Sequence, residues 1–141
     1  MPPESAPRYW IGTVSREHVL RGVAGGFGML NHGKQAPLKR LAPGDWLIYY
    51  SPKSAIEGEP LKAFTAIGRV VDKPPYQTEM APGMTGFRRD IDWQRATETP
   101  ITRLSDRLEF TRGNWGMLAR RGLFEISAAD FQTIRAAMLE N

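Results

Sequence analysis

Two aromatic residues of this sequence lie on glycine-rich backbone, where a ring is free to present a flat face. Phe27 has a glycine on each side, and Trp115 directly precedes Gly116. Rings presented in this way stack on nucleic-acid bases, because every base offers a π-face. The same pattern also fits rings that plug the end of a small barrel. Each of the two aromatics therefore has two interpretations.

The glycine-rich segment around Phe27 contains half of a phosphate-binding loop motif. Residues 28–34 match the pattern G-x-x-x-x-G-K, but the next residue is Gln35, where Mg²⁺ needs a Ser or Thr hydroxyl. A phosphate-binding loop also joins a strand to a long helix, whereas here Pro37 follows closely. The motif therefore does not indicate nucleotide hydrolysis.

Side chains for acid–base, nucleophilic or metal chemistry are few. The chain has no cysteine and two histidines: His18, in an expected helix, and His32, in the glycine-rich loop. Two histidines without thiolates or suitably spaced carboxylates make a poor metal site. No Ser–His–Asp order or G-x-S-x-G motif is present. We predict no catalytic residue, no metal and no cofactor, and keep His32 as a candidate lining residue of a binding site.

Positive charge is clustered, although the net charge is only +4. Between Lys34 and Lys53, the basic residues are accompanied by a single acidic one, Asp45. Further basic clusters are Arg88-Arg89, Arg112 and Arg120-Arg121. If the fold gathers some of these side chains on one face, that face suits a phosphate backbone.

Hydrophobic patterning predicts short strands with a few helices around them, an α+β class with a small barrel. Strands are expected at residues 9–14, 46–50, 64–71, 76–80, 87–93 and 123–126. Ser15 suits a helix N-cap, and a last helix is expected over 128–140. Gly68 suggests a bend or bulge in its strand.

The length of 141 residues fits one domain spanning 1–141, with residues 1–7 expected to form a flexible N-terminal tail. No apolar region follows the N-terminus as in a signal peptide, and no apolar run reaches the roughly 20 residues that a bilayer requires. We therefore expect a cytoplasmic protein with no membrane partner.

Motifs along nearly the whole chain resemble the bacterial EVE-domain proteins of the PUA-like superfamily. The matching segments are Tyr9-Trp10-Ile11-Gly12, Gly26-Phe27, His32-Gly33-Lys34, Pro37-Leu38-Lys39-Arg40, Pro43-Gly44-Asp45-Trp46, Tyr49-Tyr50-Ser51-Pro52-Lys53, Phe64-Thr65-Ala66-Ile67-Gly68, Tyr76-Gln77, Phe87-Arg88-Arg89, Asn114-Trp115-Gly116 and Gly122-Leu123-Phe124-Glu125-Ile126. The resemblance implies a PUA-like pseudo-β-barrel with surrounding helices. It also implies kinship with the YTH domain, which reads a methylated adenine in RNA through an aromatic cage.

By this resemblance, the chain binds DNA or RNA that carries a modified base, in a slot between the first strand and the glycine-rich loop. The implied base-binding pocket comprises Trp10, Ser15, Phe27, Asn31, His32, Ser51 and Trp115. The implied phosphate-binding residues are Lys34, Lys53, Arg88 and Arg89. Related eukaryotic EVE proteins carry Trp where this chain has Phe27, which predicts weaker stacking here. A flipped base needs aromatic faces, short polar groups and a cationic rim, and residues 27–34 and 50–53 hold all three.

Two alternatives from other classes remain open. The first is a small amidohydrolase that acts on a modified nucleoside, since some PUA-like relatives use Lys, Thr and Glu for this reaction. Lys34 would be its base, but no Thr or Glu lies near Lys34 in the sequence. The second is a protein-interaction accessory module. The sequence fixes neither the modification, nor DNA against RNA, nor the oligomeric state, nor which of Phe27 and Trp115 is the main stacking residue.

Overall fold

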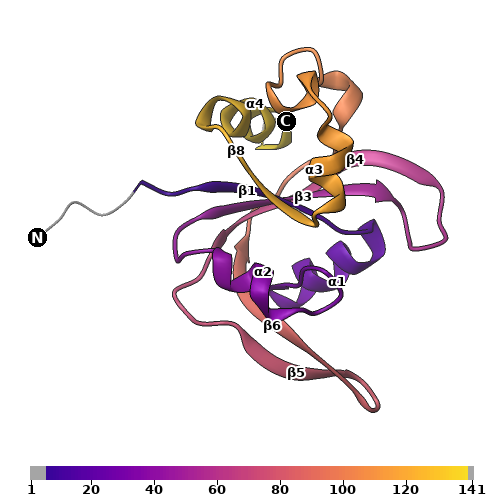
Figure 1. The fold of residues 1–141 in the computed structure, drawn as a ribbon, viewed down its shortest axis with the longest axis vertical. Coiled ribbons are helices and arrows are strands. Elements are labelled where there is room, and N and C mark those ends of the chain that lie inside the picture. Colours follow the sequence, from indigo (N-terminus) through magenta and orange to yellow (C-terminus); the bar gives the residue numbers. More distant parts are fainter. Residues whose placement is uncertain (1–5, 140–141) are drawn as a thin grey trace, which may run out of the picture.

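The computed structural model describes residues 6–139, which form eight strands, four α-helices and two short 3₁₀ helices (Figure 1). The strands are β1 (Tyr9–Thr13), β2 (Phe27–Gly28), β3 (Trp46–Lys53), β4 (Pro60–Val70), β5 (Tyr76–Ala81), β6 (Met84–Trp93), β7 (Thr99–Pro100) and β8 (Leu123–Ile126). The helices are α1 (Arg16–Gly25), α2 (Gln35–Arg40), α3 (Trp115–Arg120) and α4 (Ala128–Leu139), with 3₁₀ turns at Ile101–Arg103 and Phe110–Arg112. Of the expected tail, residues 1–5 lie outside the described part, as does Glu140 at the expected end of the last helix.

All eight strands belong to one mixed sheet with the main order β2-β6-β4-β3-β1-β8. Strand β1 pairs with β3 in parallel, so that Tyr9 lies opposite Trp46 and Thr13 opposite Tyr50, and the other pairings are antiparallel. Strand β5 extends the sheet beyond β6 as a hairpin that projects from the body (Figure 1). The predicted α+β class is confirmed. The sheet ends in β2 and β8, which do not pair with each other, so the barrel is not closed.

Two apolar clusters cover the two faces of the sheet. Ile11, Ile48 and Phe64 point to one face and pack with Phe131 and Ile134 of α4. Trp10, Leu47 and Tyr49 point to the other face and pack with Val19 of α1 and Leu38 of α2. Alternate residues of a strand point to opposite faces, so neighbouring residues of β1 and β3 supply both cores. We call these the α4-side core and the α1-side core.

The predicted strands and the last helix are confirmed, and two local features differ. Helix α2 was not predicted, because its six residues are too few for a clear periodicity, and Pro37 fits only because it lies in the first turn. The β3–β4 register shifts occur between Tyr49 and Tyr50 and between Ser51 and Lys53, not at Gly68. Gly68 instead allows a close approach, since a Cβ there would lie 2.8 Å from the Trp93 ring.

Candidate nucleic-acid interface

The carboxyl end of β1 holds two hydroxyl groups that are buried and have no hydrogen-bond partner among residues 6–139. They are Thr13 Oγ1, on the last residue of β1, and Ser15 Oγ, at the N-cap of α1. The backbone between them is fixed, because Thr13 N donates to Gly122 O (2.9 Å) and Val14 N donates to Tyr50 O (3.0 Å). A buried polar group without a partner is rare and calls for an explanation such as a ligand.

Helix α1 is held in place at this end by other residues. Glu17 N donates to Ser54 O (2.9 Å), and Arg16 Nε donates to the Glu98 carboxylate at 2.8 and 2.9 Å. Ser15 occupies the predicted N-cap position with extended backbone, yet its side chain makes no capping bond. The hydroxyl therefore remains available although the helix is anchored.

Trp115, the first residue of α3, contacts the strand that pairs with this end of β1. Its half-buried ring meets the Tyr50 ring edge-on, with centroids 5.2 Å apart, and also meets Phe110 at 6.0 Å. Tyr50 is the register partner of Thr13, and burial raises the pKa of its phenol. The structure therefore brings Ser15 and Trp115, from the predicted pocket, to the same end of β1.

The glycine-rich loop reaches the same region through Asn31. Asn31 Nδ2 donates to Arg121 O at 3.4 Å, next to Gly122, which in turn accepts from Thr13. Asn31 and His32 adopt left-handed backbone (φ 47° and 60°), followed by Gly33 at φ 88°. His32 and Lys34 are exposed on this turn, and Lys53 is exposed at the end of β3.

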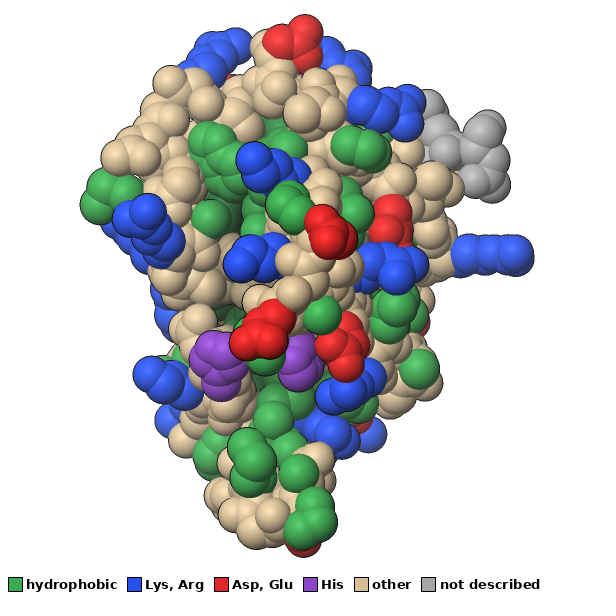
Figure 2. All heavy atoms as spheres, turned by 90° about the vertical axis from the view of Figure 1, so that its right-hand side faces the viewer, with side chains coloured by type: hydrophobic (Ala, Val, Ile, Leu, Met, Phe, Trp, Pro, Cys, Tyr) green, Lys and Arg blue, Asp and Glu red, His purple; other side chains and the backbone are tan. Residues whose placement is uncertain are grey.

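Figure 2 views the side of the molecule toward which β1 runs in Figure 1. It shows hydrophobic side chains between Lys and Arg side chains, with Asp and Glu side chains on the same face beside them. Lys34 and Lys53 form no ion pair within residues 6–139.

Phe27 lies at the opposite end of α1 from Ser15. The ten-residue helix puts about 15 Å between these two residues. Its ring packs against Gly25, where a Cβ would lie 2.4 Å from Phe27 Cε2, and the Arg88 guanidinium lies over it at 3.9 Å from the centroid. The expected freedom of a ring between glycines is therefore limited, because Phe27 belongs to β2 and one ring face is already covered.

Trp10 and Ser51 do not line an open pocket, and their assignment to one is wrong. Trp10 is 1% exposed in the α1-side core, and its Nε1 donates to Asp45 Oδ2 at 2.9 Å. Ser51 is 0% exposed, and its hydroxyl pairs with Thr65 Oγ1 at 2.8 Å. Both sit on central strands, where neighbouring elements cover the side chains.

Arg89 is not a surface phosphate ligand, which corrects a second assignment. It is 4% exposed, and its Nη1 donates to the carbonyl oxygens of Leu38 and Leu41. Burial lowers the pKa of its guanidinium. Arg89 therefore ties β6 to the end of α2, whereas its neighbour Arg88 is half-buried and lies over the Phe27 ring.

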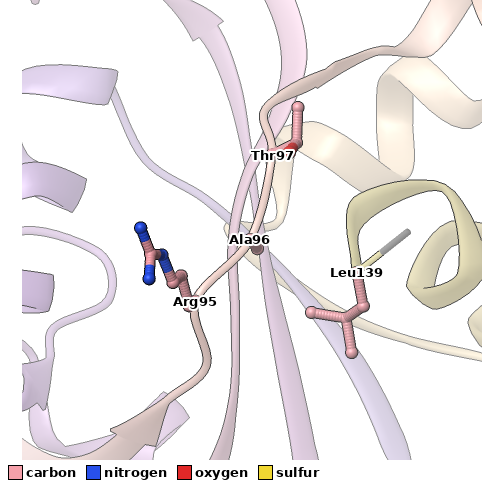
Figure 3. A pocket seen from close by; sticks show the side chains of 4 residues that line it. All are labelled: Arg95, Ala96, Thr97 and Leu139. Carbon is pink, nitrogen blue, oxygen red and sulfur yellow. The ribbon is translucent and has the colours of Figure 1, made fainter. Parts of the chain in front are cut away.

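A hollow of about 460 Å³ lies past the end of β6 and is lined by Arg95, Ala96, Thr97 and Leu139 (Figure 3). In Figure 3 the Arg95 side chain extends from this segment away from Leu139.

The sequence did not predict the residues that line this hollow as site residues, and it did not predict Thr13. Arg95 is two residues past Trp93, a position that the strand pattern does not reach. The environment of the Thr13 hydroxyl is set by Tyr50 and Gly122, which are far from Thr13 in the sequence, so no local pattern could reveal it.

Within residues 6–139, no three His, Cys, Asp or Glu side chains form a group that could hold a metal ion. In the same part of the chain, no helix has the length and hydropathy needed to cross a membrane.

Comparisons with known proteins agree on one family. The model of the EVE domain matches residues 8–137. The chain is 50% identical to a UPF0310 protein of Mycolicibacterium vanbaalenii over 133 residues, which covers 92% of each chain. It is 49% identical to the UPF0310 protein YdcG of Bacillus subtilis, covering 92% of this chain and 91% of that one.

Two solved structures share the fold at low sequence identity. The protein Rpa0253 of Rhodopseudomonas palustris has a TM-score of 0.61 at 16% identity, with 95% of this chain and 96% of that one covered. A hypothetical protein of Leishmania major has a TM-score of 0.59 at 14% identity, with 92% of each covered. With a family model that spans nearly its whole length and relatives about half identical to it, this chain belongs to the EVE-domain family.

Proposed function

We propose that this chain is a non-catalytic binding domain for nucleic acid that carries a modified base, with the base held at the carboxyl end of β1. One observation carries the proposal: the buried hydroxyls of Thr13 and Ser15 have no partner within residues 6–139, and the register partner of Thr13, Tyr50, contacts the ring of Trp115. Leaving each of them unpaired costs roughly 1–3 kcal/mol. A ligand that supplies the missing partners offsets that cost.

A nucleobase fits the chemistry of this position. A hydroxyl both donates and accepts, so a pair of them can read the mixed donor and acceptor edge of a base. A base bound there must leave its stack, and an aromatic ring replaces part of the lost stacking. Trp115 is the better placed of the two candidate aromatics, since Phe27 lies at the other end of α1 and carries Arg88 on one face.

The cations around this position suit the flanking phosphates. Lys34 and Lys53 are exposed, and Arg88 lies near the far end of α1. A strand that follows α1 from Ser15 would reach Arg88 after about 15 Å. With Arg89 buried, three of the four predicted phosphate ligands remain.

Binding rather than hydrolysis is favoured by the surroundings of Lys34. The amidohydrolase alternative needs this amine beside Thr and Glu side chains. Lys34 is instead an exposed N-cap residue that makes no side-chain hydrogen bond or ion pair within the described chain.

The experiment is a titration of single-stranded DNA and RNA tetranucleotides, each with one methylated or one unmodified base, followed by fluorescence anisotropy at several salt concentrations. We expect one modified series to bind more tightly than its unmodified match. Its log affinity should fall with log salt at a slope of about −2, from three phosphate contacts of about −0.7 each. Removing Lys53 as Lys53→Gln should flatten the slope by one such step. Equal binding of all bases, or turnover of an acylated nucleoside in the same panel, would contradict the proposal.

A further inference from the structure

Four arginines surround the amino end of β1, at the opposite end of this strand from the proposed base site. They are Arg8, Arg40, Arg69 and Arg135, and all four are exposed. Arg8 and Arg69 line a hollow of about 540 Å³ together with Pro43, Gly44 and Asp45. We call this set the arginine edge.

The guanidinium groups of the arginine edge are held against two tryptophan rings. Arg8 and Arg40 lie 4.7 and 5.2 Å from the Trp10 ring centroid, and Arg69 and Arg135 lie 5.1 and 5.4 Å from that of Trp46. Arg69 also donates to Gly44 O at 3.1 Å. Stacking fixes the plane of a guanidinium while leaving its outer N–H groups free, so less flexibility is lost when it binds an anion.

Local acidic groups offset only part of this charge. Asp45 is 3% exposed and accepts three hydrogen bonds from Arg8 N, Trp10 Nε1 and Ala42 N. Glu125 is paired with Arg8. Within residues 6–139, Arg40, Arg69 and Arg135 have no carboxylate within ion-pair distance.

We infer that the arginine edge is a second phosphate-binding surface, which holds the backbone of a nucleic acid beyond the modified base. This inference rests on the proposed function. Planar guanidinium forks match phosphate oxygens in two-bond geometry, which favours phosphates as the ligand. The five residues of β1 span about 16 Å between the two sites. A tetranucleotide has three phosphates, which the three cations around the base site occupy, so only a longer strand also contacts the arginine edge.

The test compares a tetranucleotide with a 16-nucleotide strand that carries the same modified base, against the triple variant Arg40→Gln, Arg69→Gln, Arg135→Gln. For the 16-mer, the salt slope should flatten by about 2, since each lost phosphate contact removes about 0.7. Binding of the tetranucleotide should not change. Arg103→Gln is the matched control, because Arg103 is exposed and forms no ion pair within the described residues.

An unchanged 16-mer slope in the triple variant would overturn the inference, as would an equal loss on both lengths. Poly-glutamate is the second ligand in the test. If it binds as tightly as the 16-mer and depends equally on the three arginines, the edge recognises carboxylates and the inference is wrong. Failure of the base site has a different signature: the 16-mer would still bind through the arginines, but without preference for the modified base.

Discussion

At the amino end of β1, the buried carboxylate of Asp45 accepts three hydrogen bonds, from two backbone amides and the Trp10 indole. At the carboxyl end, one strand length away, the hydroxyls of Thr13 and Ser15 are buried and find no partner in the described part of the chain. Both ends pair with the same strand, β3, and both lie next to an aromatic ring. They differ in whether the chain itself satisfies its buried polar groups.

The difference separates buried polar groups that stabilise the fold from buried polar groups that are left for a ligand. The Asp45 network at the amino end is satisfied within the chain, so substitutions in it should act mainly on stability, whereas the exposed arginines around it are the proposed phosphate ligands. Polar groups at the carboxyl end lower stability in the free protein, and a ligand that pairs with them regains it. The predictions below test this separation.

The largest expected effect is on folding, from Asp45→Ala. The substitution leaves three donors without their acceptor in a buried place, and we expect a loss of about 3 kcal/mol or more in the free energy of unfolding. Urea denaturation followed by tryptophan fluorescence measures it. Asp92→Ala, at an exposed carboxylate with no side-chain partner within residues 6–139, should change stability by less than about 0.5 kcal/mol. Similar values for the two variants would show that Asp45 is not a structural centre.

Next in size is the loss of binding in Trp115→Ala. If this ring stacks on the base, affinity should fall by about 1–3 kcal/mol. Trp115→Phe keeps a stacking face and should recover part of the affinity, which separates stacking from damage to the Tyr50 and Phe110 contacts. Phe27→Ala should leave affinity within about 0.5 kcal/mol. Normal binding by Trp115→Ala with weakened binding by Phe27→Ala would move the base to the other end of α1.

Two threonines, one with a hydrogen-bonded hydroxyl and one with an unpaired hydroxyl, should change the free energy of unfolding by about 1 kcal/mol in opposite directions when replaced by valine. Thr65 Oγ1 pairs with Ser51, so Thr65→Val should lower stability by about 1 kcal/mol or more. Thr13 Oγ1 has no partner within residues 6–139. Thr13→Val should therefore raise the stability of the free protein by about 1 kcal/mol, because an isosteric methyl group replaces an unpaired hydroxyl. Thermal unfolding of both variants without ligand measures this. Destabilisation by both would mean that Thr13 has a partner in solution.

The smallest effect concerns the exposed Arg8–Glu125 pair. The hydrogen bond from Arg8 lowers the pKa of Glu125, so the pair adds stability above the carboxylate's ordinary pKa and loses it as pH falls through the lowered value. Glu125→Gln should therefore be slightly less stable at pH 7, and the difference should disappear once the pH has fallen below the lowered pKa of Glu125. Glu109→Gln, with an exposed carboxylate unpaired within the described residues, is the control and should show no such pH dependence. A difference that persists in acid would exclude the ion pair as its cause.

Much of the sheet could be predicted from local patterns, because aromatic and β-branched runs mark its strands. The alternation over residues 87–93 is an instructive case. It placed Arg89 on the same face as Ile91, and the structure buries both, whereas charge alone suggested that Arg89 holds a phosphate. Trp10 likewise lies in a run expected to form a buried strand. In both residues, the strand pattern was a better guide than side-chain chemistry.

The site itself could be predicted only in part. Ser15 and Trp115 were named because of their residue types and motifs. The status of Thr13 could not be inferred, because it depends on Tyr50 and Gly122, which are far away in the sequence. The cover over Phe27 comes from Arg88, more than sixty positions later, so its neighbouring glycines did not reveal it.

The most direct test measures two quantities on one preparation of Thr13→Val: its stability without ligand and its affinity for the preferred modified tetranucleotide. If the hydroxyl is kept unpaired for the base, the variant should be more stable than the wild type and should bind roughly tenfold more weakly, since one hydrogen bond to the base is lost. A variant that is more stable and binds as tightly as the wild type would contradict the assignment of the base to the carboxyl end of β1.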